Sequence, residues 1–121
     1  MSTAIVLFAH GSRDPLWHRP IQAVAEAVAR REPAMAVRCA YLELSTPSLP
    51  DAVADLLATG VRHIRVFPVF LGVGKHARED LPALMQALRT EHPTVQFELL
   101  PSAGEAPALT ELLAELALGQ R

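Results

Sequence analysis

Residues 4–9 read Ala-Ile-Val-Leu-Phe-Ala and run directly into His10-Gly11-Ser12. An apolar run of this length, without polar alternation, is typical of a strand that is buried on both faces of a parallel sheet. Residues 62–70 read Arg-His-Ile-Arg-Val-Phe-Pro-Val-Phe and predict another strand of the same sheet. Helical patterns follow both stretches, so the sequence indicates an α/β domain in which strands and helices alternate.

The segments between and after these strands carry apolar residues at helical spacing. Pro20 lies near the start of the first expected helix, and Gly60 ends the second. We expect Thr46 to be the N-cap of the second helix, with Pro47 at its first helical position. A third helix is expected after residue 80, with Pro82 in its first turn. The four apolar stripes are Ile21, Val24, Ala25 and Val28; Leu49, Val53, Leu56 and Leu57; Leu81, Leu84, Met85 and Leu88; and Leu109, Leu112, Leu113 and Leu116.

Two further strands are expected at residues 34–43 and 95–99. Four β–α units in series predict a doubly wound three-layer sandwich, with a four-stranded parallel sheet in the order 2-1-3-4 and helices on both faces. We interpret the closing helix as a packing helix. With 121 residues, the chain fits a single domain over residues 1–121. In such sheets ligands bind beyond the carboxyl ends of the strands where the order reverses, here between the first and third strands.

Composition narrows the function classes. Half of the residues are hydrophobic and a fifth are charged, as in a folded globular protein, and the net charge of −2 offers no basic excess for a nucleic acid partner. Cys39 is the only cysteine, so neither an intrachain disulfide nor a cysteine-based zinc site is expected, and we interpret it as a buried small hydrophobe. No signal peptide or membrane-length apolar run is recognised, so we expect a cytoplasmic protein without a membrane partner.

Residues whose side chains can bind a metal ion or accept a proton follow three of the expected strands. His10 comes after the first strand, His76 lies in the segment after the third, and Glu43 ends the second. Imidazole and carboxylate together suit divalent first-row metals, and imidazole also accepts protons near neutral pH. Each residue alone is also compatible with an ordinary hydrogen-bonded or solvated position. His18 is a further candidate to face the cleft, whereas His63 and His92 lack such support.

The two loops at the expected switch point also carry basic and apolar side chains. Arg13, Lys75 and Arg78 flank the two histidines, beside an apolar rim of Phe70, Leu71 and Val73. This combination favours an anionic ligand with a broad apolar body, although ordinary solvated charges remain an alternative. The glycines of the 72–75 segment match neither phosphate-loop spacing and are interpreted as turn residues. Ser12 lacks the surroundings of a hydrolase nucleophile.

Three stretches together resemble the small sirohydrochlorin chelatases, which are class II chelatases: His10-Gly-Ser-Arg-Asp-Pro15, Tyr41-Leu-Glu43 with Thr46-Pro-Ser-Leu49, and residues 68–82. Those enzymes are lyases that insert Co²⁺, Ni²⁺ or Fe²⁺ into a tetrapyrrole in cobalamin, coenzyme F430 or siroheme biosynthesis. The resemblance implies a chelatase-like fold and makes His10, His76 and Glu43 the catalytic and metal-site residues. It implies no permanent cofactor, because the divalent metal is a substrate.

The same resemblance implies a polycarboxylate tetrapyrrole as partner and a homodimer as the working form. The substrate-binding residues it suggests are Ser12, Arg13, Phe70, Leu71, Gly72, Val73, Gly74, Lys75 and Arg78. Two alternatives stay open at the level of sequence. One is a tetrapyrrole or metal carrier that binds without catalysis, and the other is a flavodoxin-like signalling or interaction module without small-molecule chemistry.

Overall fold

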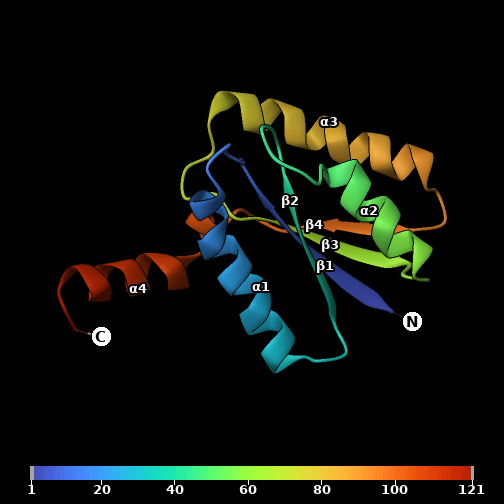
Figure 1. Ribbon diagram of the computed structural model, residues 1–121. Helices are drawn as coiled ribbons and strands as arrows, with labels where there is room; N and C mark the ends of the chain where they lie inside the picture. The colour runs from blue at the N-terminus through green and yellow to red at the C-terminus, as the bar shows by residue number, and fades with distance from the viewer. Residues whose placement is uncertain (1, 121) are drawn as a thin grey trace.

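The computed structural model describes residues 2–120, in which the side chain of His76 is not described. Four parallel strands form one sheet in the order β2-β1-β3-β4 (Figure 1), as the sequence predicts. The strands are β1 (Thr3–Ala9), β2 (Ala36–Tyr41), β3 (His63–Pro68) and β4 (Gln96–Leu99). Residue 6 of β1 pairs with Arg38 and Val66 of its two neighbours, so β1 and β3 lie side by side at the centre. The switch point therefore lies between β1 and β3.

The helices divide between the two faces of the sheet. They are α1 (Arg19–Arg31), α2 (Leu49–Ala58), α3 (Lys75–Glu91) and α4 (Pro107–Ala117), with short 3-10 turns η1 (Pro15–His18) and η2 (Ala103–Glu105). Helices α2 and α3 cover one face and α1 lies on the other (Figure 1). No helix in residues 2–120 combines the length and apolarity that a bilayer crossing requires.

The face under α2 and α3 holds the main core. Alternate residues of β1, namely Ala4, Val6 and Phe8, point to this face and are at most 1% exposed. The expected stripes meet them there, since Leu56 of α2 and Met85 of α3 are fully buried. Because both helices present apolar side chains at the predicted spacing, these two stripes are confirmed.

The opposite face has a smaller core. It is built around Leu7, Ile21 and Tyr41, and Cys39 packs against it half-buried. Burial of the Cys39 thiol raises its pKa, which agrees with the prediction of a small buried hydrophobe rather than a reactive thiol. Helix α1 covers only part of this face, which leaves Phe67 and Val69 half-buried.

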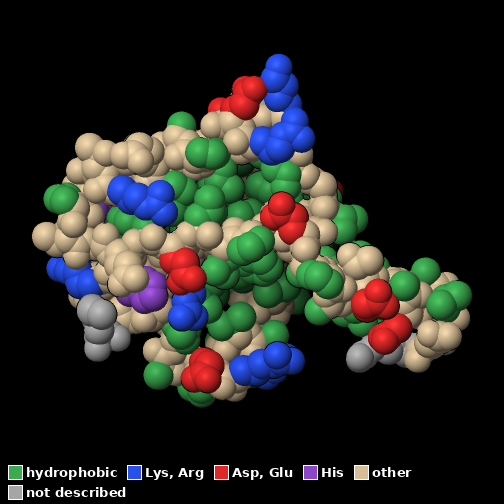
Figure 2. All heavy atoms as spheres, turned by 180° about the vertical axis from the view of Figure 1, so that it is seen from behind, with side chains coloured by type: hydrophobic (Ala, Val, Ile, Leu, Met, Phe, Trp, Pro, Cys, Tyr) green, Lys and Arg blue, Asp and Glu red, His purple; other side chains and the backbone are tan. Residues whose placement is uncertain are grey.

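Helix α4 forms where the leucine spacing predicts it, but its role differs from the prediction. None of its residues is buried, and it extends away from the sheet (Figures 1 and 2). Leu113 is 41% and Leu116 is 53% exposed. The interpretation as a packing helix is therefore wrong within one copy of the chain. The physical reason is its attachment, because Ala106 ends η2 and also caps α4, so that no loop allows the helix to turn back.

The second helix begins two residues later than expected. Its N-cap is Ser48, whose side chain accepts a hydrogen bond from the Asp51 N–H, and not Thr46. The carbonyl of Pro47 accepts a hydrogen bond from the Tyr41 N–H at 3.0 Å, so the chain still runs beside the end of β2 at this point. Thr-Pro and Ser-Leu-Pro are both acceptable helix starts, and this tertiary contact selects the later one.

The third helix begins earlier than expected. Gly74 caps α3, and the Arg78 N–H donates to the Gly74 carbonyl at 3.0 Å. Pro82 therefore lies inside the helix rather than in its first turn, and His76 lies in the first helical turn rather than in a loop. Residues 75–81 include Lys, Ala, Arg, Glu and Leu, which are good helix formers and extend the helix ahead of the proline.

Candidate functional site

The site begins just beyond the ends of β1 and β2, where the backbone hydrogen bonds between these two strands continue into the segments that follow them. The Leu42 N–H donates to the Ala9 carbonyl at 2.9 Å, and the Glu43 N–H donates to the His10 carbonyl at 3.0 Å. These bonds place the backbone of Glu43 directly beside that of His10, while the Glu43 side chain is exposed. Two of the three predicted site residues are thus neighbours at the carboxyl edge of the sheet.

Gly11 allows this close approach. Its φ is +96°, and a Cβ at this position would overlap the carbonyl oxygen of Glu43 and crowd the Cβ of Tyr41. Only glycine combines the left-handed conformation with the absence of a side chain. The glycine after His10 is therefore required by the packing of the two loops against each other.

The imidazole of His10 is held by an aromatic contact across the switch point. Its ring stacks on that of Phe70, with centroids 4.2 Å apart and planes 27° apart. Phe70 follows β3 and is only 2% exposed, and the adjacent Val69 N–H donates to the Phe8 carbonyl at 2.7 Å. Stacking occupies a face of the imidazole and leaves its nitrogens, at the ring edge, for a metal or a proton. The predicted meeting of the β1 and β3 loops is confirmed at this contact.

A second imidazole, that of His18, links the segment after β1 to the end of β2 and the loop that follows it. The ring of His18 stacks on Tyr41 with centroids 4.5 Å apart, and its Nε2 lies 2.9 Å from the Ser45 hydroxyl. That hydroxyl also donates to the Ser12 carbonyl and accepts from the Ser12 N–H. With the hydroxyl proton used on Ser12, we assign the His18 contact to an Nε2–H donor. Ser45 has no signature in the sequence, because only the fold brings residues 12, 18 and 45 together.

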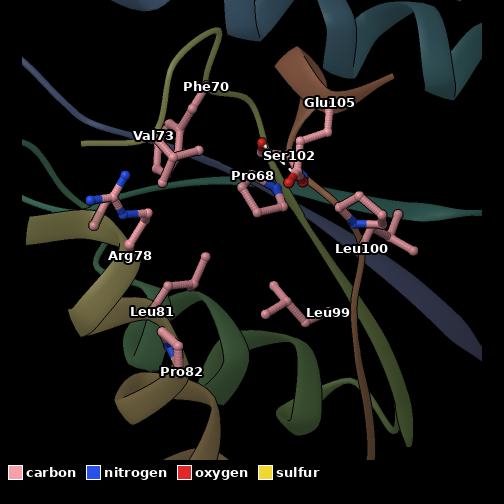
Figure 3. A pocket seen from close by; sticks show the side chains of 12 residues that line it. Pro68, Phe70, Val73, Arg78, Leu81, Pro82, Leu99, Leu100, Ser102 and Glu105 are labelled. Atoms are coloured by element: carbon pink, nitrogen blue, oxygen red, sulfur yellow. Dashed lines mark hydrogen bonds between the residues drawn. The ribbon is translucent and has the colours of Figure 1, made fainter. Parts of the chain in front are cut away.

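Two cavities lie on either side of Phe70. One, of about 490 Å³, lies beside His10 and is bounded by Trp17, Tyr41 and Leu71. The other, of about 540 Å³, lies between α3 and the end of β4 and is lined mainly by prolines and leucines (Figure 3). Figure 3 shows Arg78 at its margin, near Val73 and Phe70. Apolar walls with a few polar groups are the usual character of small-molecule sites.

The predicted substrate-binding residues divide among these features. Phe70, Leu71 and Gly72 line the cavity beside His10, whereas Val73 and Arg78 share the other cavity with Phe70. Four predicted residues line neither of these two cavities: Ser12, Arg13, Gly74 and Lys75. The Ser12 hydroxyl accepts a hydrogen bond from the Asp14 N–H and so also serves the local turn. The basic side chains of Arg13, Lys75 and Arg78 are exposed at this edge of the molecule.

The three-residue metal site stays a prediction. Among the side chains that the structure describes, no group of three or more His, Cys, Asp or Glu lies close enough together to hold a metal ion. The predicted ligand His76 lies outside the described side chains, although its backbone starts α3 near the β3 loop. Burial raises the pKa of Tyr41, so this phenol beside the cavity stays neutral well above neutral pH.

The sheet order, the imidazole at the switch point and the apolar cavities together define a small-molecule-binding protein of the parallel α/β class. Comparison with known families makes this more specific. The model of the CbiX family matches residues 4–118, and the chain belongs to that family.

Individual relatives agree with this assignment. A sirohydrochlorin cobaltochelatase of Methanococcoides burtonii is 30% identical over 119 residues, covering 93% of this chain and 88% of that protein. A sirohydrochlorin cobaltochelatase of Methanothermobacter thermautotrophicus is 37% identical over 81 residues, covering 67% of this chain but only 56% of that protein.

Solved structures support the same fold. A putative cobalamin biosynthesis CbiX protein of Marinobacter aquaeolei superposes with a TM-score of 0.84 at 32% identity, covering 98% of this chain and 96% of that one. The sirohydrochlorin chelatase SirB of Bacillus subtilis, solved in complex with cobalt, superposes with a TM-score of 0.82. At 22% identity the latter likeness concerns the fold alone, and this chain covers 51% of SirB.

Proposed function

We propose that this protein is a sirohydrochlorin chelatase, which inserts Co²⁺, and on the same chemistry Ni²⁺ or Fe²⁺, into the tetrapyrrole. The observation that carries the proposal is the imidazole of His10, held by Phe70 at the switch point of a chain of the CbiX family. Relatives named sirohydrochlorin cobaltochelatases supply the substrate. Both the metal and the macrocycle are substrates, and no resident cofactor is required by this chemistry.

Metal insertion requires that the ion lose water and that two pyrrole N–H protons leave the ring. A neutral imidazole is both a good ligand for these ions and a proton acceptor near neutral pH. Stacking on Phe70 restricts the His10 ring and so holds its nitrogens ready for either task. Glu43, anchored by its N–H to the His10 carbonyl, presents an exposed carboxylate from the neighbouring loop as a further ligand or base. His76 is proposed as the third member.

The basic side chains give a reason for a polycarboxylate ring. Arg13, Lys75 and Arg78 are exposed at the edge that carries His10, and Arg78 borders an apolar cavity. Guanidinium groups bind carboxylates in a forked geometry, while the ring body favours apolar walls. A carrier that binds without catalysis would use the same groups, so turnover is the property that separates the two functions.

The decisive test is an insertion assay with metal-free sirohydrochlorin and Co²⁺, Ni²⁺ or Fe²⁺, followed by the absorbance change of the ring. Wild-type protein is expected to turn over many equivalents, and His10→Ala to lose about 100-fold in kcat/KM. His92→Ala is the matched control, because His92 is the C-cap at the opposite end of α3 from Lys75, and this variant is expected to leave the rate unchanged. Stoichiometric binding without turnover by the wild type would instead establish the carrier.

We further propose that the working form is a homodimer built through α4. The helix extends from the body with Leu113 and Leu116 exposed, and the sheet face that carries Phe67 is only partly covered by α1. One copy therefore has an exposed amphipathic helix and an apolar sheet face that is only partly covered. In the proposed dimer, the α4 helix of each copy covers that face of the other. The chain spans 51% of SirB, which leaves room for a second unit of this size in that longer chain.

Sedimentation velocity tests the dimer. Leu113→Glu with Leu116→Glu is expected to give a monomer, whereas Thr110→Glu with Ala114→Glu adds the same two charges to other exposed positions of α4 and should remain dimeric. A monomeric wild type at micromolar concentration would contradict the proposal.

We also place the protein in the cytoplasm, where the free thiol of Cys39 is stable, and cell fractionation tests this location.

A further inference from the structure

Trp17 is a large aromatic residue in an unexpected environment. Its side chain is 56% exposed, yet it borders the 490 Å³ cavity that also contains His10. Val24 and Leu71 border the same cavity and are also among the exposed large hydrophobic residues. Apolar groups left together in water around a cavity point to a ligand or partner that covers them.

The indole is held there by a well-defined turn. Asp14 is the N-cap of η1, with its side chain accepting from the Leu16 N–H at 3.0 Å and its carbonyl accepting from the Trp17 N–H at 3.0 Å. Pro15 occupies the first position of the turn and further restricts it. The backbone of Trp17 is thus fixed while its ring gains little from burial, so the folding of the chain does not account for the ring.

Two other aromatic rings bound the same cavity from other parts of the fold. Phe70 comes from the loop after β3 and stacks on His10, and Tyr41 ends β2 and stacks on His18. Both are at most 5% exposed and therefore form fixed walls.

We propose that Trp17 is a substrate-binding residue. Its indole packs on a face of the tetrapyrrole while His10 contacts the metal. This inference rests on the proposed chelatase function and identifies the surface that holds its substrate. Flat conjugated rings favour offset or edge-on contact with aromatic side chains, and the indole supplies the largest apolar area among them. The exposed Arg13, four residues before Trp17, lies on the same loop and suits a peripheral carboxylate of the ring.

Trp17 is the only tryptophan of the chain, so its fluorescence reports on this site directly. Titration of wild-type protein with metal-free sirohydrochlorin is expected to quench the emission saturably, in the concentration range of the KM. N-acetyltryptophanamide in the same solutions corrects for light absorbed by the ring. Saturating substrate that leaves the emission unchanged would overturn the proposal.

Kinetics give the second test, with a matched control in the same turn. Trp17→Ala is expected to raise KM about tenfold with kcat within about twofold, and Trp17→Phe to recover most of the loss. Leu16→Ala removes a neighbouring side chain that is 59% exposed but does not line the cavity, and it should leave KM unchanged. Equal KM values for the two alanine variants, with unchanged melting temperatures, would overturn the inference.

The outcomes separate this inference from the chelatase function on which it rests. If the wild type inserts metal but Trp17→Ala has a normal KM, only the role of Trp17 is wrong. If sirohydrochlorin quenches Trp17 but no metal is inserted, the chelatase function is wrong and the binding surface remains. Emission that changes with protein concentration alone, together with an unchanged KM for Trp17→Ala, would show that a second copy rather than the substrate contacts Trp17, which would also overturn the proposal.

Discussion

The two faces of the sheet are built very differently. Under α2 and α3, Val6, Phe8 and Val66 are at most 1% exposed and belong to one continuous core. On the face of α1, the neighbouring strand residues Phe67 and Val69 stay half-buried, and α4 extends into solvent. The difference teaches that the closed face holds most of the buried core, whereas the other face and the edge above it stay partly open.

The largest expected effect concerns two phenylalanines, one on each face of the sheet, and tests whether the two faces differ in stability. Phe8→Ala opens a cavity in the closed core and should lower the free energy of unfolding by about 3–5 kcal/mol. Phe67→Ala, on the half-covered face, should cost about half of that or less, because its side chain already contacts solvent. Urea denaturation at a protein concentration where the chain is monomeric measures both. Equal losses would show that the second face is as closed as the first.

The next effect concerns the edge where the site lies. Gly11→Ala forces a left-handed residue and a clash with the Glu43 carbonyl, so we expect a loss of stability of about 2–4 kcal/mol. Gly72→Ala is the control, because its Cβ would meet no atom within 4 Å. Its stability should change by less than about 1 kcal/mol. Thermal unfolding distinguishes the two glycines, and a tolerated Gly11→Ala would contradict the packing described.

A smaller effect on stability is expected where the Ser45 hydroxyl links the loops that follow β1 and β2. Ser45→Ala removes the hydroxyl shared by Ser12 and His18 and should cost about 1–3 kcal/mol, because half-buried polar groups lose their partner. Ser2→Ala removes an exposed hydroxyl bonded to the Gly60 carbonyl and should cost less than about 0.5 kcal/mol. Chemical denaturation compares them. Equal, small losses would mean that the Ser45 hydroxyl does not stabilise the loops.

The smallest effect is a pH dependence on the half-covered face. Burial raises the pKa of Cys39 above its ordinary value of 9.0, so the folded state favours the neutral thiol. The stability from this group is complete below the unfolded pKa and is lost as pH rises through the folded pKa. Cys39→Ala should therefore show a shallower fall of unfolding free energy above pH 9 than the wild type. The remaining slope belongs in part to Tyr41, whose pKa is raised in the same direction.

Much of the fold was predictable because it depends on local spacing. The apolar runs at β1 and β3 have the period of buried strands, and Leu56 and Met85 fall on helical stripes that are buried as expected. The strand order was predicted as the commonest one for small doubly wound sheets, and the structure has it. Those rules also place His10 beside the β3 loop, where it stacks on Phe70.

Other features had no local signature. Ser45 and Trp17 look like ordinary loop residues in the sequence, and only the fold brings one to His18 and the other to the cavity beside His10. The predicted roles of Glu43 and His76 remain predictions, because the positions of their side chains relative to a metal depend on long-range geometry. Residue type indicates the chemistry that is possible, whereas distance decides whether it occurs.

The sequence by itself determined the four β–α units and the imidazole that follows β1, because periodicity and strand burial are properties of neighbouring residues. Only the tertiary structure decided that Ser48 rather than Thr46 caps α2, since the choice depends on the Tyr41 N–H binding the Pro47 carbonyl. It likewise decided that α4 leaves the sheet, since the join at Ala106 sets its direction. A leucine stripe specifies that a helix must be covered, but not which chain covers it.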